Sequence, residues 1–309
     1  MSSSNFLFLF LMALGPILSV SSSNWLICWV GVEITFLGLI PLLVSSEMSF
    51  FSLSKESSMK YFCIQALGSG LLLFSGIIIF MFPLEINLFS LVIFLFSLMI
   101  KLGVFPAHFW VPSVVSGLSI FSMFLVLTWQ KIVPFFLLIN FLDIYLEFHN
   151  IILIFGGISA LIGAFIGLNQ TQISPMLGAS SITHGGWLLL GSVYGNLWVY
   201  FFIYCFNFLV LVYFLWVKDT TMMGMMVLSL SGLPPFIMFI GKWSIFSISL
   251  MQGFGFWYLI FPVLGSIMSL FFYLKFFYSF YLEEELSKMK SFIWLGFSCL
   301  MGLMFITLF

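Results

Sequence analysis

Apolar stretches of about 20 residues follow one another through the sequence and are joined by short connections. A helix of this length crosses the hydrocarbon core of a membrane, where no water is present to bond an unpaired backbone group. Of the 309 residues, 63% are hydrophobic and only 6% are charged, a balance that soluble domains do not have. The sequence therefore predicts an all-α, polytopic membrane protein.

The hydropathy pattern predicts about eleven spanning helices, which together form a single membrane domain over residues 1–309. The expected spans are residues 4–20, 24–43, 57–82, 88–116, 118–140, 149–168, 172–193, 196–217, 222–250, 256–282 and 289–309. Their connections are too short to hold a separate nucleotide or redox domain. The four cysteines are scattered and form no cluster with histidine, so we expect neither a metal nor a cofactor in this chain.

Two of the expected spans contain a lysine beside glycine and proline. These residues lie in Ile100–Ser119 and Leu228–Trp243, within sequence that is otherwise almost wholly apolar. Proline removes a backbone donor, and irregular backbone at membrane depth is tolerated only where it is buried in protein or lines water. We therefore expect broken helices over residues 88–116 and 222–250.

The two broken helices hold corresponding places in the chain. Each is the fourth helix of a group of five, in residues 4–140 and 149–282, and a C-terminal helix over 289–309 follows. Because five is odd, consecutive groups cross the membrane in opposite directions. The sequence predicts two inverted five-helix repeats, in which broken helices mark a transporter's ion site. The alternative is that proline and glycine are simply frequent in membrane helices.

Four ionisable residues fall near the middle of expected spans: Glu33, Lys101, Lys131 and Lys242. A charge at the centre of a membrane costs about 2.5–3.5 kcal/mol, so these side chains should face protein or water. Glu33 can pair with only one lysine, which argues against a set of purely structural ion pairs. An amine held away from water releases its proton more readily than an exposed amine. We therefore expect these four residues to transfer protons.

Two histidines also lie within expected spans, His108 beside Pro106 and His184 in SSITHGGW. Histidine exchanges protons near neutral pH, which suits a relay. A single histidine in a membrane helix can equally serve only as an interhelical hydrogen bond. Both alternatives remain open from the residues alone, and we treat both histidines as candidate proton-transfer residues.

Lysines gather on one side of the expected topology. When the connections are assigned alternately to two sides, the side of the N-terminus receives Lys55, Lys60, Lys218, Lys288 and Lys290, and the other side receives no lysine. The positive-inside rule then places the N-terminus in the cytoplasm or the mitochondrial matrix, and the C-terminus on the opposite side. A net charge of −1 argues against binding of nucleic acid.

Seven stretches carry a resemblance to a known family. In chain order they are NWLICWVGVEI, MKYFCIQALGSGLLL, IKLGVFPAHFWVPSVVSGLS, TWQKIVP, GLNQTQ, SSITHGGW and SLSGLPPFIMFIGKW. In this order they resemble the subunit 2 family of mitochondrial NADH:ubiquinone oxidoreductase, which is respiratory complex I. The resemblance covers nearly the whole chain.

The resemblance implies a proton-translocating, antiporter-like core subunit of the membrane arm of that complex. It implies the mitochondrial inner membrane, with the N-terminus in the matrix and the C-terminus in the intermembrane space. The enzyme would be the H⁺-translocating NADH:ubiquinone reductase as a whole, with no redox centre in this chain. The implied partners are other membrane-arm subunits, including neighbouring antiporter-like subunits, and membrane lipids.

The resemblance also assigns roles to motif positions. The family's buried glutamate matches Glu33 in VGVEI, and the lysine of its broken helix matches Lys101 in IKLG. Its central lysine matches Lys131 in WQK, and its distal lysine matches Lys242 in GKW.

The two histidines, His108 and His184, match family positions on the hydrated central axis. The chain departs from the family at Ser113, where glutamate is common, and at Ile173–Met176, where a basic residue is common. Neither departure touches the four central charges, but both change their local surroundings.

Other functions fit parts of the pattern. A stand-alone cation/proton antiporter is the main alternative, although Glu33 is the only central carboxylate and hard cations prefer several oxygen ligands. A purely structural scaffold is opposed by the four charges in the middle of spans. A haem-carrying cytochrome is disfavoured because only His108 and His184 lie inside expected spans, whereas His149 lies at the edge of a loop.

Overall fold

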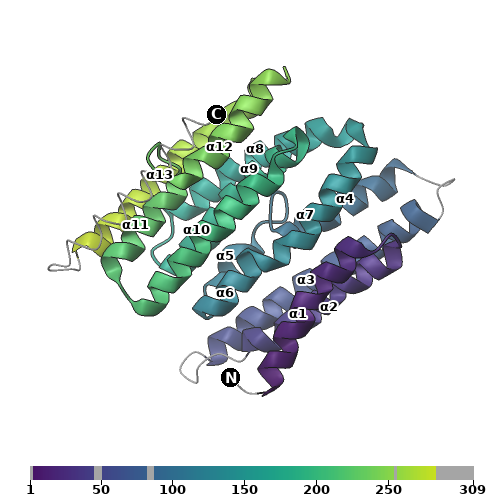
Figure 1. Cartoon of the computed structure of the whole chain (residues 1–309), viewed down its shortest axis with the longest axis horizontal. Helices are drawn as coiled ribbons and strands as arrows, with labels where there is room; N and C mark the ends of the chain where they lie inside the picture. The colour runs from purple at the N-terminus through teal and green to yellow at the C-terminus, as the bar shows by residue number, and fades with distance from the viewer. Residues whose placement is uncertain (1–2, 45–50, 82–86, 254–255, 283–309) are drawn as a thin grey trace. The chain divides into compact units, whose positions relative to one another are not determined.

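The structure is a computed structural model that describes residues 3–44, 51–81, 87–253 and 256–282. Within these ranges the regular elements are thirteen α-helices and two short 3-10 helices, so the predicted all-α class is confirmed (Figure 1). The chain forms two compact units, Met1–Leu146 and Glu147–Phe309.

The first unit contains α1 (Ser3–Ser21), α2 (Trp25–Val44), α3 (Phe51–Met81), α4 (Leu88–Leu102), α5 (Trp110–Val115), α6 (Ile120–Leu127), the 3-10 helix η3 (Trp129–Lys131) and α7 (Ile132–Ile144). A second 3-10 helix, η4 (Leu146–Phe148), lies at the boundary. The second unit contains α8 (His149–Leu168), α9 (Ile173–Tyr194), α10 (Leu197–Val217), α11 (Thr220–Ser231), α12 (Ile237–Met251) and α13 (Trp257–Leu282).

Six helical segments of the described chain are long and apolar enough to cross a membrane. They are Trp25–Val44, Ser52–Phe80, Ile120–Ile144, Leu146–Leu168, Leu197–Val217 and Trp257–Leu282. The multi-pass membrane character predicted from the sequence is thereby confirmed. The predicted helix over residues 289–309 lies outside the described residues.

Helix α9 differs from these six segments because it is surrounded by protein. Every residue from Pro175 to Ser192 is buried. Small residues allow α8 to approach closely: a Cβ on Gly186 would lie 2.7 Å from Ala160 N, and a Cβ on Gly163 would lie 2.7 Å from Thr183 N. Close backbone packing through small residues is typical of membrane helices. This packing fixes the position of His184, in the middle of α9.

The interruptions predicted over residues 88–116 and 222–250 are both confirmed. Helix α4 ends at Leu102 and α5 begins at Trp110, whereas α11 ends at Ser231 and α12 begins at Ile237. Each first half ends in a glycine with a left-handed backbone, Gly103 with φ 68° and Gly232 with φ 74°. Glycine adopts this conformation without the steric cost of a Cβ, so it terminates a helix readily.

The span predicted over residues 118–140 is present as the apolar segment Ile120–Ile144, and it contains a third interruption that the sequence did not predict. Helix α6 ends at Leu127, and η3 precedes α7. Pro134 has no N–H to bond the carbonyl of Gln130, and its ring clashes with that carbonyl in a regular helix. The proline is therefore accommodated in the first turn of α7, where no such bond is needed.

Candidate functional site

Glu33 and Lys101 attract each other within the first unit. Glu33 lies in the middle of α2, and Lys101 lies in the last turn of α4. The carboxylate acts electrostatically on the Lys101 ammonium, whose side chain is only 6% exposed. Glu33 Oε1 is buried and has no hydrogen-bond partner in the described part of the chain. This oxygen is therefore left with capacity to accept a proton or a water.

The backbone at the end of α4 is bonded from three directions. Met99 O accepts from the N–H groups of Gly103 at 3.0 Å and Val104 at 3.3 Å. Ile100 O accepts from Trp110 Nε1 at 3.1 Å, and Lys101 O accepts from Gln65 Nε2 at 3.5 Å. Carbonyls at a helix end have no partner within the helix, and in an apolar setting they must find one elsewhere. These bonds hold Lys101 at a defined place in the broken helix.

A small cavity of about 10 Å³ lies beside Lys101. Its polar lining consists of Thr35, Gln65, Lys101 and Gln130. Gln130 Nε2 also donates to Thr35 O at 3.1 Å. A space of this size with several polar partners is what a single buried water requires. Because Gln130 precedes Lys131 in η3, the cavity joins the surroundings of two predicted proton-transfer lysines.

Lys131 itself is 4% exposed and lies in η3, at the third interruption. His108 is 2% exposed and lies between α4 and α5, where its ring packs at a tilt against Phe109 with centroids 4.0 Å apart. His108 Nδ1 is buried without a hydrogen-bond partner among the described residues. The structure thus places both side chains inside the first unit, at breaks in helices.

Lys242 links the two halves of the second broken helix. Its Nζ donates to Ser231 O at 2.7 Å, across the gap between α12 and α11. The side chain is 9% exposed, and Nζ lies 6.0 Å from the centroid of the Trp187 ring. The C-terminal end of a helix carries a partial negative charge. The end of α11 and the aromatic face therefore both stabilise the ammonium form in a place from which most water is excluded.

His184 is bonded on both sides of its ring. Nδ1 lies 2.9 Å from the Tyr200 hydroxyl on α10, and Nε2 lies 3.3 Å from the Tyr273 hydroxyl on α13. The ring also contacts Tyr204, with centroids 5.1 Å apart. The histidine is thus an interhelical hydrogen-bond centre, and its two bonded nitrogens also give it the connections that a relay needs.

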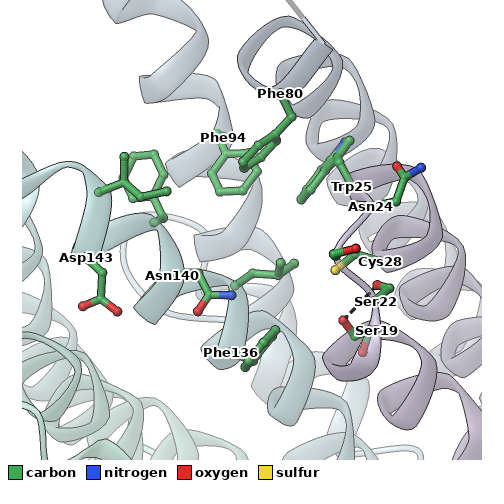
Figure 2. A pocket seen from close by; sticks show the side chains of 14 residues that line it. Ser19, Ser22, Asn24, Trp25, Cys28, Phe80, Phe94, Phe136, Asn140 and Asp143 are labelled. Carbon is green, nitrogen blue, oxygen red and sulfur yellow. Dashed lines mark hydrogen bonds between the residues drawn. The ribbon is translucent and has the colours of Figure 1, made fainter. Parts of the chain in front are cut away.

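A larger cavity of about 380 Å³ lies at one end of the first unit (Figure 2). It lies between the end of α1, the start of α2 and the end of α7, with Ser22, Asn24, Asn140 and Asp143 among its polar residues. Phe80, Phe94 and Phe136 are among its aromatic residues. On α2 its lining residue nearest to Glu33 is Cys28, five positions away, which is about 7.5 Å along a helix. The polar lining of this cavity therefore approaches the Glu33 carboxylate, but Glu33 is not among the lining residues.

The predicted residues thus fall into two local groups. In the first unit, Glu33 and Lys101 interact, and the small cavity adjoins Lys101 and the residue before Lys131. In the second unit, His184 and Lys242 share the surroundings of Trp187. Sequence reasoning missed four polar residues of these groups, Gln65, Gln130, Tyr200 and Tyr273. Both glutamines lie in motifs that carried the resemblance, and this was the only indication in the sequence that they could belong to the site.

Comparison with known proteins supplies the class. Residues 22–222 match the family described as NADH:quinone oxidoreductase/Mrp antiporter, TM, and the chain belongs to this family. The fold agrees: the structure of respiratory complex I from Thermus thermophilus with bound aureothin contains a chain that superposes with a TM-score of 0.77 at 21% sequence identity. That superposition covers 97% of this chain and 76% of the other.

Within the family, the chain is similar to one particular subunit. It is 37% identical to NADH-ubiquinone oxidoreductase chain 2 of Albinaria caerulea over 279 residues, which cover 90% of each protein. It is also 37% identical to the protein of the same name from Anopheles gambiae, over 90% of this chain and 86% of that protein. The resemblance found in the seven motifs is therefore confirmed along most of the chain.

Proposed function

We propose that this chain is a proton-translocating, antiporter-like subunit in the membrane arm of respiratory complex I. The similarity to NADH-ubiquinone oxidoreductase chain 2 supports this assignment. The observation that carries the mechanism is that the three lysines buried within the described residues all lie at interrupted helices. Broken helices supply free backbone groups and small polar spaces, which a proton path through a membrane needs.

In this mechanism Glu33 and Lys101 form the input pair. A change in the distance between the two charges alters how strongly the ammonium is stabilised, and so whether Lys101 holds or releases its proton. Lys131 is the central relay, reached from Lys101 through the small cavity. Lys242 is the distal site, and His108 and His184 support transfer within their own units.

The finer architecture belongs to the same proposal. We place the chain in the inner mitochondrial membrane, with the N-terminus in the matrix and the C-terminus in the intermembrane space. It has about eleven spans, arranged as inverted repeats over residues 4–140 and 149–282 with a further helix at 289–309. The matching positions of the breaks at Gly103 and Gly232 support the repeat. The chain holds no redox centre, and quinone reduction elsewhere in the complex drives it through neighbouring membrane-arm subunits.

The test is a Lys131→Met variant of the assembled complex, reconstituted in vesicles. Methionine has a similar length but carries no proton, so assembly should stay near normal while NADH-driven proton flux falls about tenfold or more. Lys60→Met is the control, because Lys60 is a surface residue paired with Glu56. Unchanged pumping in the Lys131 variant, at equal assembly, rejects the relay role.

A stand-alone cation/proton antiporter is the second candidate, supported by the antiporters that the family description names. It requires the isolated chain to exchange Na⁺ for protons. Purification of the native assembly separates the two candidates. A chain that is found alone and catalyses a Na⁺-dependent pH change in vesicles would replace the complex I assignment.

A further inference from the structure

His184 is the centre of a buried hydrogen-bonded chain. Three helices of the second unit contribute to it: Tyr200 from α10, His184 from α9 and Tyr273 from α13. All three side chains are buried, with exposures of 0% for both tyrosines and 2% for His184. Their protons must therefore be shared among themselves and with adjacent polar groups.

The direction follows from two hydroxyls beside Tyr273. The Tyr273 hydroxyl interacts with the side chains of Ser180 and Thr183. Ser180 Oγ already donates to Leu177 O at 2.8 Å, and Thr183 Oγ1 donates to Ser180 O at 2.7 Å. With those protons on backbone carbonyls, both oxygens are available to accept a proton from Tyr273.

This arrangement of hydroxyl protons favours one tautomer of His184. When Tyr273 donates to Ser180 or Thr183, it accepts from Nε2–H of His184. A neutral imidazole has one donor and one acceptor nitrogen, so Nδ1 is bare and accepts from the Tyr200 hydroxyl. Every bond in the chain therefore points from Tyr200 through His184 to Tyr273.

The donor end of this chain lies against the element that carries Lys242. A Cβ on Gly241, the residue before Lys242, would lie 2.9 Å from Cδ2 of Tyr200. The Lys242 ammonium faces the ring of Trp187, which is three positions after His184 on α9 and hence on nearly the same side of that helix. The lysine and the start of the chain are therefore neighbours within one unit.

We propose that Tyr200 and Tyr273 are further proton-transfer residues, which with His184 form a directed chain that carries protons away from Lys242; this inference rests on the proposed function. The Lys242 ammonium gives a proton, through a water molecule, to the Tyr200 oxygen. Tyr200 passes its hydroxyl proton to Nδ1, and Nε2 passes its proton to the Tyr273 oxygen. Tyr273 then gives its own hydroxyl proton to a further water molecule instead of holding it toward Ser180 and Thr183.

The protons balance in this step. Lys242 becomes a neutral amine, one water becomes hydronium, and both tyrosines regain the proton that they gave. No bond between heavy atoms forms or breaks. His184 ends with its proton on Nδ1 instead of Nε2, so a second proton can follow only after the first tautomer is restored. The chain is thus a gate that passes one proton at a time.

The experiment uses Tyr200→Phe, Tyr273→Phe and the double variant in the assembled complex, because phenylalanine keeps the ring and removes only the hydroxyl. Tyr204→Phe is the matched control: Tyr204 is equally buried and packs on the same imidazole, while the ring nitrogens bond the other two tyrosines. Each single variant should lower NADH-driven proton flux about tenfold, and the control should not. Residues in series act as a unit, so the double variant should be no worse than either single one.

Two results would overturn the inference. One is a flux in both single variants equal to that of Tyr204→Phe at equal assembly. The other is a loss that multiplies in the double variant, since independent structural damage adds in free energy. Lys242→Met is measured in parallel. If it lowers flux while the tyrosine variants do not, only the directed chain fails; if it too has no effect, the proposed role of Lys242 fails as well.

Discussion

At the scale of single residues, the buried lysines are tolerated because each lies where a helix is interrupted. The interior of a regular helix offers an ammonium no free acceptor, whereas the end of a helix exposes carbonyl oxygens. Lys242 uses this directly by bonding Ser231 O. Lys101 lies in the last turn of α4, where the helix dipole also favours a positive charge. Charge and broken backbone thus stabilise each other.

Gln65 should matter as much as a charged residue, because it bonds Lys101 O and lines the small cavity. Gln65→Leu leaves that carbonyl unbonded, which costs about 1–3 kcal/mol, and removes a polar partner of the cavity water. We expect NADH-driven proton flux to fall about tenfold with assembly retained. Gln252→Leu, at an exposed position, is the control. Equal flux in the two variants would show that no proton passes through this cavity.

The central charges were predictable from sequence, because a charge in an apolar span stands out without any knowledge of its neighbours. Their neutral partners were not. Tyr200 and Tyr273 look like ordinary aromatic residues until α9, α10 and α13 are packed together. The surroundings of Ser113, where the chain departs from the family, are visible only in the structure. Its side chain is exposed and donates to Trp110 O at 2.9 Å, within its own short helix.

At the scale of elements, and within the described residues, the sequence located the helices to within about six residues and indicated two of the three interruptions. Glycine, proline and lysine stand together in the two that were found. At Thr128–Lys131 no glycine is present, and Pro134 stands alone. A single proline commonly only bends a helix, so the sequence carried too weak a signal. Helix α3 begins at Phe51 instead of residue 57, because the polar segment around Lys55 continues the helix beyond the apolar span.

The break after α4 can be tested with three glycine-to-alanine variants. Gly103 has a left-handed backbone, and a Cβ there would overlap Val111. Gly195 has φ 85° with open space around it, and Gly70 is helical with open space. Gly195→Ala should cost about 1–2 kcal/mol from backbone alone, and Gly103→Ala should cost about 1–3 kcal/mol more from the overlap. Gly70→Ala should be neutral or slightly stabilising.

These differences in stability are measured by thermal inactivation of the assembled complex and by the amount of complex formed. The expected order of stability is Gly70→Ala first, Gly195→Ala second and Gly103→Ala last. A Gly103 variant as stable as the Gly195 variant would mean that the turn around Val111 relaxes easily, and that the geometry of this break is not fixed by packing.

At the scale of the whole molecule, each unit contains a helix that is broken at a glycine beside a buried lysine, Lys101 in the first unit and Lys242 in the second. The first unit surrounds Lys101 with amide groups and a small cavity, and the second provides Lys242 with a backbone carbonyl and the Trp187 ring. The two lysines therefore have different means of losing a proton: a change in the Glu33 attraction for Lys101, and transfer toward Tyr200 for Lys242. This difference fits an input site and a distal site.

The last prediction concerns the side of the membrane on which each turn lies. In the proposed topology, alternate crossings place the turn between α1 and α2, with the large cavity and Asp143, on the side without lysines, and the turn between α8 and α9 on the lysine-rich side. Ser23→Cys and Thr171→Cys introduce a thiol at an exposed position in each turn. A membrane-impermeant maleimide should label Ser23→Cys in mitoplasts and Thr171→Cys in inverted inner-membrane vesicles. The unaltered chain measures background from native cysteines. Labelling of both variants from one face would contradict the alternate crossings, and labelling with the two faces exchanged would reverse the proposed orientation.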